Sequence, residues 1–217
     1  IPGVVYAGPG SVEKINEVLQ REKAQSVLLF TDKAVRGADL TKRVEELCSA
    51  VKLTVIDDLA SEPSYQDVER VIDEVRVANI DLVIGVGGGS VMDAAKLASI
   101  VIGADYGVRD LLKDPTIAKK YIKSLMIPTT CGTGSEATCN SIVAIPEEQS
   151  KQGIINNCMI PDYVILDAEM IRHLPSKVLA ATGVDALAHV VECFTSNKAT
   201  ILSDIYAIEG AKKIFHN

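Results

Sequence analysis

The chain has 217 residues, of which 47% are hydrophobic and 24% charged, and its formal net charge at pH 7 is −7. This composition is typical of a globular protein, and the length allows one full domain and part of another, at roughly 100–200 residues per domain. The acidic balance argues against nucleic acid and anionic membranes as partners. No run of about 18 apolar residues stands out, so we expect no membrane-spanning segment and no membrane partner.

The cysteines indicate the redox compartment of the protein, and the first residues indicate whether the sequence starts at the natural N-terminus. The five cysteines include no CxxC pair and their number is odd, which excludes zinc-finger and thioredoxin patterns. We therefore expect reduced, mostly buried thiols in a cytoplasmic protein. The start, Ile1-Pro2-Gly3, carries neither an initiator methionine nor a signal-peptide pattern, so we expect that residues preceding it are missing.

Up to about residue 165, short apolar runs alternate with amphipathic segments. The strands expected from these runs are 26–30, 53–56, 82–86 and 123–127. The helices expected from apolar spacing are 12–21, with Ser11 as its N-cap, 40–50, 65–78 and 91–102. Strands separated by helices of about ten to fifteen residues predict βαβ units and a largely parallel sheet.

After Pro146 the pattern changes. The segments 141–145 and 151–155 are expected to be strands joined by a polar turn, and 163–167 is expected to be a further strand. From Pro175 onward the chain is expected to be helical, over 178–181, 184–194 and 201–215. We therefore expect an α/β domain over residues 1–168 and the beginning of a helical domain, truncated at its end, over 169–217.

The segment Gly87-Gly88-Gly89-Ser90 follows an apolar run and precedes a helical pattern. A strand, a glycine turn and a helix in this order present free backbone N–H groups and a positive helix end to a phosphate. Ser90 can cap that helix and add a hydroxyl donor. The pattern is neither the GxGxxG fingerprint nor a P-loop, and taken alone it is also compatible with a tight turn.

Three charged residues near this turn have structural as well as functional interpretations. Asp93 can interact with the helix dipole, and Lys96 is either a solvated charge or the partner of Asp93 at i+3. Asp32 ends the strand 26–30, where a carboxylate can bind the ribose hydroxyls of NAD and repel the 2′-phosphate of NADP. The same residue can equally be an Asx-type turn residue.

A second donor-rich loop, PTTCGTGSEAT, follows the strand 123–127 and spans residues 128–138. Its hydroxyl residues, including Thr129, Thr130 and Thr138, suit the ribose and phosphates of a nucleotide, with Glu136 bracing the loop. An ordinary polar turn is the alternative for this loop alone. Two such loops after parallel strands indicate a ligand site, because ligands gather at the carboxyl ends of such strands.

Asp185 and His189 are four residues apart in a helical segment, so they project from the same helix face. A carboxylate and an imidazole at this spacing can chelate one divalent cation. The alternatives are an ordinary ion pair or a buried hydrogen-bonded pair. Two protein ligands do not complete a catalytic metal site.

Together these segments resemble the iron-containing, or group III, alcohol dehydrogenase family. GGGSVMDAAK is similar to the family's pyrophosphate loop, PTTCGTGSEAT to its second signature, ATGVDALAHVVECF to its metal-helix signature, and YAGPGSVEKI to its opening hairpin and helix. The motifs occur in the expected order along essentially the whole chain. The resemblance implies a Rossmann-like parallel sheet followed by the start of an all-α metal-binding domain, a dehydroquinate synthase-like architecture.

The resemblance also implies a role for each matched residue. NAD, rather than NADP, would be bound by Asp32, Gly87, Gly88, Gly89, Ser90, Asp93, Thr129, Thr130, Thr138 and Lys151. Asp185 and His189 would be the first two ligands of Fe²⁺, with Zn²⁺ as the alternative. Two further histidines complete the family's metal site, and this chain ends before them.

The implied reaction is reversible hydride transfer between NAD and a small primary alcohol or diol, which gives an aldehyde or ketone. The resemblance also implies a homodimer or higher homo-oligomer. The sequence presents no convincing general base, so no catalytic residue is assigned. The alternatives are a polyol dehydrogenase or synthase of the same superfamily, and a nucleotide-binding fragment without catalysis.

Overall fold

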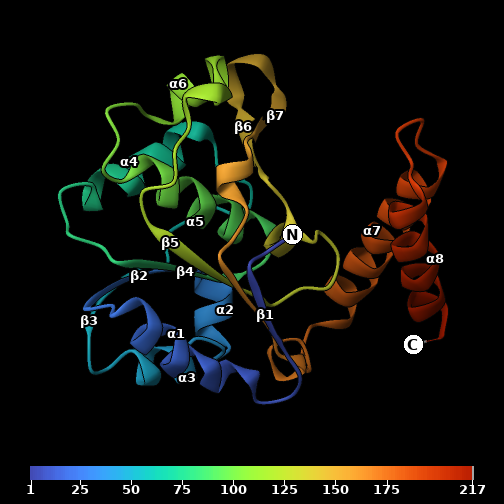
Figure 1. The fold of residues 1–217 in the computed structure, drawn as a ribbon, viewed down its shortest axis with the longest axis horizontal. Coiled ribbons are helices and arrows are strands. Elements are labelled where there is room, and N and C mark those ends of the chain that lie inside the picture. The colour runs from blue at the N-terminus through green and yellow to red at the C-terminus, as the bar shows by residue number, and fades with distance from the viewer. Residues whose placement is uncertain (217) are drawn as a thin grey trace. The chain divides into compact units, whose positions relative to one another are not determined.

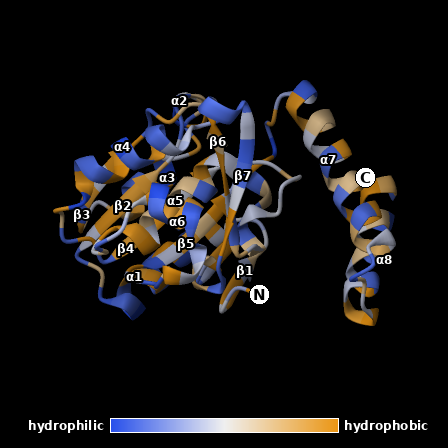
Figure 2. Cartoon of the chain, turned by 90° about the horizontal axis from the view of Figure 1, so that it is seen from above, coloured by the Kyte–Doolittle hydropathy of each residue, from blue (hydrophilic) through white to orange (hydrophobic). Residues whose placement is uncertain are grey.

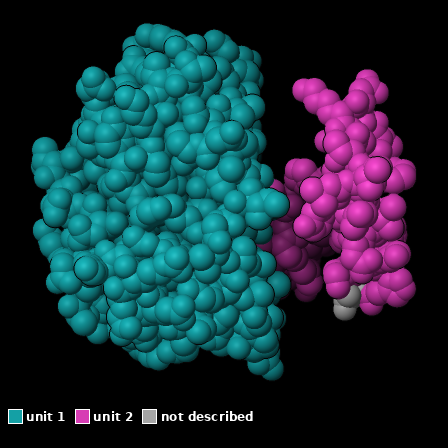
Figure 3. Space-filling model, viewed as in Figure 1, with its two compact units in different colours: residues 1–129, 134–172 teal, residues 130–133, 173–217 magenta. Residues whose placement is uncertain are grey.

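The computed structural model describes residues 1–216, which form two compact units (Figure 1 and Figure 3). Unit 1 consists of residues 1–129 and 134–172, and unit 2 of residues 130–133 and the chain from 173 onward. The short segment 130–133 therefore belongs with the helices that follow much later in the sequence. The expected domain boundary after residue 168 lies just before the division at 172.

Unit 1 is built on a six-stranded parallel sheet with the strand order β1-β8-β5-β4-β2-β3. Its strands are Val4–Ala7 (β1), Ser26–Phe30 (β2), Lys52–Ile56 (β3), Leu82–Gly87 (β4), Lys123–Pro128 (β5) and Tyr163–Leu166 (β8). The chain places β3 on one side of β2 and the later strands on the other. This reversal places the switch point of the sheet between β2 and β4, and in sheets of this kind ligands bind at the carboxyl ends of the strands beside the switch point. The expected parallel, Rossmann-like sheet is confirmed.

Helices cover both faces of this sheet (Figure 1). They are Ile15–Glu22 (α1), Lys33–Gly37 (α2), Lys42–Leu47 (α3), Tyr65–Val75 (α4), Gly89–Val101 (α5) and Val108–Lys113 (α6). Along β2, Leu28 and Phe30 pack into the core with α4, α5 and α6, whereas Val27 and Leu29 pack into the core with α1 and α3. All of β2 is buried because both faces of the sheet are covered.

Some expected elements differ from the observed ones at their ends. The helix expected over 40–50 is confined to α3, and α2 and α6 were not expected from apolar spacing. Asn140–Ile145 (β6) and Ser150–Ile155 (β7) form the expected antiparallel pair in a sheet of their own. The opening hairpin implied for the first residues is not formed, because β1 pairs in parallel with β8.

The expectation that Ser11 caps the first helix is wrong. Ser11 begins a 3-10 turn that ends at Lys14, and Lys14 is the N-cap residue of α1. The 3-10 turn itself is capped by Gly10, whose φ of 78° is in the left-handed region. The buried carboxylate of Asp167, which follows β8, accepts hydrogen bonds from the N–H groups of Gly10 (3.1 Å) and Val12 (3.0 Å). Asp167, which is distant in sequence, thus binds free backbone N–H groups at the start of this turn, a role expected of the side chain of Ser11.

Unit 2 contains two helices, Ser176–Thr195 (α7) and Ile201–His216 (α8). α7 runs without interruption through Gly183, where two separate segments were expected. Within residues 1–216, α7 is the single helix long and apolar enough to cross a membrane by length and composition, with a mean hydropathy of 1.4. Apolar and polar residues alternate along it (Figure 2), and one such helix is weak evidence for a membrane, so the expectation of no membrane-spanning segment stays a prediction.

The thiols are less buried than expected. All five cysteines are free, but only Cys48 is buried, and Cys131 is exposed. The remaining three are half-buried. Burial raises the pKa of the Cys48 thiol to about 11.

Candidate nucleotide site and metal-ligand pair

The glycine turn lies where β4 ends and α5 begins. Gly88 is the N-cap residue of α5 and, as a glycine, supplies no side chain to cap the amides of the first turn. These amides are therefore available to an anion such as a pyrophosphate. Gly87 is required by close packing, since a Cβ there would lie 2.7–2.9 Å from the side-chain atoms of Val91.

The expectation that Ser90 caps α5 is wrong. Ser90 lies inside the first turn, and its hydroxyl donates to the backbone oxygen of Ser61 at 2.8 Å. This bond holds the segment after β3 against the start of α5. A direct contact between Ser90 and a phosphate stays a prediction.

Two neighbouring strands end beside the glycine turn and supply polar groups. Thr129 follows β5, is buried, and donates its N–H to the carbonyl of Gly87 at 3.0 Å. Asp32 follows β2 and is the N-cap of α2, where its Oδ1 accepts from the N–H groups of Ala34 and Val35, each at 2.8 Å. The turn-residue interpretation of Asp32 is thus confirmed, and its ribose contact stays a prediction.

α5 is buried at every position from Val91 to Val101, which includes the charged residues Asp93 and Lys96. The solvated-charge interpretation of Lys96 is therefore wrong. Its Nζ lies 2.8 Å from Asp93 Oδ1, and this buried pair is the expected i+3 partnership. Burial lowers the pKa of Lys96, while the neighbouring Asp93 carboxylate opposes that shift.

This pair holds the second loop against α5. The Nζ of Lys96 donates to the backbone oxygens of Ser135 (3.0 Å) and Asn140 (2.5 Å) and to Thr138 Oγ1 (3.0 Å). The carboxylate of Asp93 accepts from the Ser135 hydroxyl and from the N–H of Ile142 at 2.9 Å. Asp93 thus faces the loop and β6, and its direct contact with a cofactor stays a prediction.

Sequence reasoning did not recognise this network, although a signal was present. A helical segment that is apolar on all sides indicates a buried helix, and a charged pair within it must then be matched by polar groups. Glu136, expected to brace the loop, is half-buried, and burial raises the pKa of its carboxyl group.

Lys151 lies on β7 and is exposed. Its Nζ pairs with Glu62 Oε1 at 2.7 Å, with both side chains more than half exposed. Such a pair contributes little stability, so it leaves Lys151 free to exchange partners when a ligand arrives.

Within unit 2, the segment 130–133, which includes Thr130, lies against α7. Cys131 Sγ is 3.8 Å from Thr182 Oγ1, and a Cβ on Gly132 would lie 2.7 Å from the backbone oxygen of Thr182 and 2.9 Å from Asp185 Oδ2. A glycine is needed here because its backbone approaches α7 so closely.

Asp185 and His189 project from one face of α7, with 3.6 Å between Asp185 Oδ1 and His189 Nδ1. Their side chains are 43% and 56% exposed, so the alternative of a buried pair is wrong. Carboxylate oxygen and imidazole nitrogen are suitable donors for Fe²⁺ or Zn²⁺, and the pair fits two positions of such a site. Within residues 1–216, no third His, Cys, Asp or Glu joins them in a metal-binding cluster.

A parallel sheet with a glycine turn at its switch point defines unit 1 as a Rossmann-like α/β domain. Residues 2–168 match the family described as iron-containing alcohol dehydrogenase. The chain belongs to this family, as the signature motifs indicated.

Curated relatives and solved structures agree with this membership. The chain is 33% identical to long-chain-alcohol dehydrogenase 1 of Geobacillus thermodenitrificans, over 98% of this chain and 55% of the relative. It is 30% identical to sulfoacetaldehyde reductase of Bilophila wadsworthia, over 98% of this chain and 56% of the relative. The chain spans about half the length of the curated relatives it matches.

The fold is shared with solved members of the family. A sulfoacetaldehyde reductase of Bifidobacterium kashiwanohense in complex with NAD⁺ has a TM-score of 0.92 at 26% identity, covering 99% of this chain and 57% of that chain. An iron-containing alcohol dehydrogenase of Thermotoga maritima has a TM-score of 0.88 at 30% identity, covering 100% of this chain and 62% of that chain.

Proposed function

We propose that the chain is the NAD-binding part, with the start of the metal-binding part, of a metal-dependent alcohol dehydrogenase. A hydride would pass from the carbinol carbon of a small primary alcohol or diol to the nicotinamide of NAD⁺. The hydroxyl group would lose its proton, and the product would be an aldehyde or ketone. The observation that carries this proposal is the uncapped, glycine-opened N-terminus of α5 at the switch point of a sheet in this family.

In this proposal the residues of unit 1 bind and orient the cofactor. The amides that follow Gly88 hold the pyrophosphate, with Gly87 and Gly89 allowing its approach to the main chain. Thr129 and Thr138 contact the adenosine part, and Lys151 reaches the ribose from β7. Fixing the cofactor on a rigid sheet edge is the protein's main contribution to hydride transfer.

The surroundings of Asp32 support NAD over NADP. A 2′-phosphate at this position would meet the Asp32 carboxylate at the end of β2. One nearby cation, Arg36, is already paired, with Nη1 at 2.6 Å from Asp57 Oδ2 and Nε at 3.3 Å from Glu45 Oε1. A 2′-phosphate would therefore have to compete with carboxylates for this guanidinium.

In unit 2, Asp185 and His189 would supply two ligands to Fe²⁺ or Zn²⁺, and Thr130 a further contact to the nucleotide. A divalent metal held there would act as a Lewis acid toward the alcohol oxygen. Family membership supports iron, and the donor types suit both cations.

The alternative is a nucleotide-binding protein without catalysis. A polyol dehydrogenase or synthase of the same superfamily is a further alternative. A cytoplasmic location and a homo-oligomer are part of the proposal, and the free thiols support the former.

The proposal is tested by loading the protein with Fe²⁺ or Zn²⁺ and following NADH formation with a series of primary alcohols and diols. Alcohol-dependent NADH formation that is lost in Asp185→Ala supports the dehydrogenase. NAD binding without turnover under every metal condition selects the non-catalytic alternative. Turnover that is unchanged in Asp185→Ala contradicts the metal assignment.

A further inference from the structure

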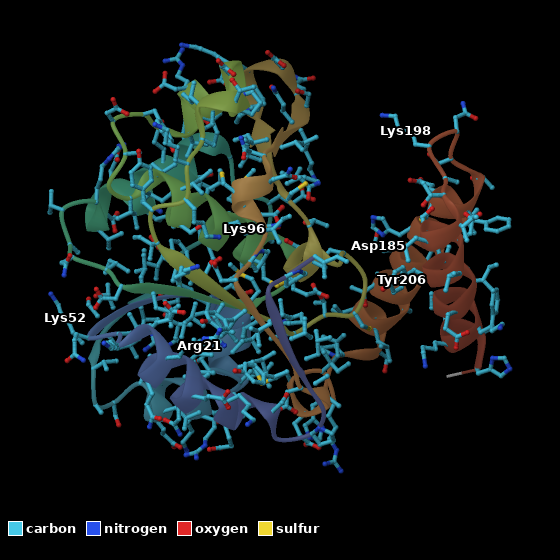
Figure 4. All side chains as sticks on the ribbon, in the orientation of Figure 1. Arg21, Lys52, Lys96, Asp185, Lys198 and Tyr206 are labelled. Atoms are coloured by element: carbon cyan, nitrogen blue, oxygen red, sulfur yellow. The ribbon has the colours of Figure 1, made fainter. Side chains whose placement is uncertain are left out.

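Lys96, labelled in Figure 4, is the most completely buried charge of unit 1. Every acceptor of its hydrogen bonds outside α5 lies in the second loop or at the start of β6. Its side chain is 0% exposed, whereas a lysine on a helix surface would keep its ammonium in water. A buried charge must be compensated by hydrogen bonds to polar groups. Here those groups belong to the second loop and the start of β6, and the second loop is part of the proposed nucleotide site.

The bonding of Lys96 is saturated. Its three ammonium protons face four acceptors: Asp93 Oδ1, Thr138 Oγ1, and the backbone oxygens of Ser135 and Asn140. Asp93 is part of the same network, because its carboxylate also accepts from the Ser135 hydroxyl and the Ile142 N–H. The end of the loop is thereby tied to α5, the helix whose N-terminus faces the glycine turn.

The bonding also fixes the chemical character of the Thr138 hydroxyl. Lys96 can only donate, so Thr138 Oγ1 accepts from it, and the hydroxyl proton goes to the backbone oxygen of Ser135 at 3.2 Å. One acceptor position remains on Oγ1. The hydroxyl can therefore receive a hydrogen bond from a ligand, but it has no proton left to donate to a phosphate.

We propose that Lys96 is a positioning residue that holds the second loop in its binding conformation and presents Thr138 as an acceptor to a donor group of the nucleotide. This inference rests on the proposed NAD site. The adenine amine and the adenosine ribose hydroxyls are the donors available on NAD. Neither Lys96 nor Asp93 needs to touch the cofactor for this role.

The chain offers a matched control at the opposite end of the sheet. Lys120 precedes β5 and is also largely buried, with Nζ at 3.2 Å from Asp162 Oδ2, 3.0 Å from Ser124 Oγ and 3.1 Å from the backbone oxygen of Ile160. These contacts lie at the amino ends of β5 and β8. Removing this lysine breaks a comparable ion pair far along the strands from Thr129.

The experiment compares the affinity of NADH, by its fluorescence on binding, in the full chain and in the variants Lys96→Met and Lys120→Met. We expect Lys96→Met to weaken binding by about 10- to 100-fold, as misplacement of a binding loop does, and Lys120→Met to change it less than about twofold. Hydrogen exchange should speed up at the amides of residues 135–142 in Lys96→Met only. Equal affinities of the two variants in a folded state would overturn the inference.

If Lys96→Met does not fold, Asp93→Asn combined with Lys96→Met removes both charges together and leaves no unpaired ion in the core. The same loss of affinity is expected, and unchanged affinity in this folded variant overturns the inference. A wild-type chain that is folded and binds no NADH would refute the proposed function itself, which is a different result.

Cofactor analogues distinguish the two donor groups. Nicotinamide hypoxanthine dinucleotide lacks the adenine amine, and analogues with 2′- or 3′-deoxyadenosine lack one ribose hydroxyl. The analogue without the group that meets Thr138 should bind about tenfold more weakly than NAD to the wild type, and this penalty should disappear in Lys96→Met. If every analogue loses the same affinity relative to NAD in the wild type and in Lys96→Met, then Lys96 does not make Thr138 a hydrogen-bond acceptor for the nucleotide.

Discussion

Unit 1 and unit 2 differ in how completely their apolar side chains are buried. In unit 1 the sheet is covered on both faces, and α5 is buried along its whole length after the first turn. In α7 and α8 the one buried residue is Ala207, and Ile201, Tyr206 and Phe215 are 83%, 65% and 74% exposed. An apolar groove of about 420 Å³ lies between the two helices, lined by residues such as Val190, Phe194 and Ile208.

This difference in burial coincides with the division between the residues proposed to bind the cofactor, which lie mostly in unit 1, and those proposed to bind the metal, which lie in unit 2. The residues of unit 1 assigned to the cofactor lie on a well-packed core, in which the buried pair of Lys96 and Asp93 binds the second loop. Asp185 and His189 lie on α7, in which no residue is fully buried by the other described residues. We therefore expect the nucleotide half to tolerate little change in its packing and the metal half to tolerate more.

The largest effect is expected for Gly85→Ala in β4. A Cβ at this position would lie 2.9 Å from Met126 Sδ and 3.0 Å from Ala95 Cβ, which overfills the contact between the sheet and α5. We expect unit 1 to lose about 1–3 kcal/mol of unfolding free energy, measured by denaturant unfolding. An unchanged unfolding midpoint would mean that α5 can move away from the sheet, and the rigidity attributed to unit 1 would be wrong.

A somewhat smaller effect is expected for Asp162→Asn, and it depends on pH. Burial alone would raise the pKa of Asp162, but its contacts with Lys123, Lys120 and the N–H of Ser124 lower the pKa below its ordinary value. A carboxyl group with a lowered folded-state pKa stabilises above its unfolded value of about 3.9 and loses this contribution as the pH falls below it. The difference in unfolding free energy between wild type and Asp162→Asn should therefore shrink from pH 6 toward about pH 3. A difference independent of pH would contradict this linkage.

Gly183→Ala provides the counterpart of Gly85→Ala in unit 2. Nothing lies within 4 Å of a Cβ at this position in α7, and alanine has the higher helix propensity. We expect a gain of helix stability of up to about 1 kcal/mol, seen as a higher midpoint of the helical circular-dichroism signal. A loss of stability would show that α7 is more tightly packed than described.

The smallest effect on folding is expected for Ile205→Glu and Phe215→Glu in α8, whose side chains are 59% and 74% exposed. A chain that exposes so much apolar surface should self-associate, and the charges should reduce this association in light scattering without moving the unfolding midpoint of unit 1. A wild-type chain that elutes as a clean monomer in gel filtration would contradict the expectation of association.

Much of unit 1 could be predicted because its strands are short apolar runs between amphipathic helices, and the glycine turn marks the switch point. The 3-10 turn that precedes α1 could not be predicted, because its N–H groups are bound by Asp167, which follows the last strand of the sheet. Ser90 was misassigned because its local position suits a cap, whereas the backbone oxygen of Ser61 was the available partner. Lys96 was ambiguous because sequence spacing does not state whether a helix is buried on all sides.

The same limit applied to unit 2. The spacing of Asp185 and His189 predicted that both lie on one helix face, which is what α7 shows. That residues 130–133 belong with this helix could not be predicted, because a contact between Gly132 and Thr182 joins segments far apart in the sequence.

Calorimetric titration of the chain with NAD⁺ and with NADP⁺ tests the cofactor assignment most directly. We expect saturable binding of one NAD⁺ per chain and much weaker binding of NADP⁺. Asp32→Asn keeps the cap on α2 but removes the charge, so the ratio of the affinities for NAD⁺ and NADP⁺ should fall in this variant. A folded chain that releases no heat of binding with NAD⁺, or that prefers NADP⁺, would contradict the proposal.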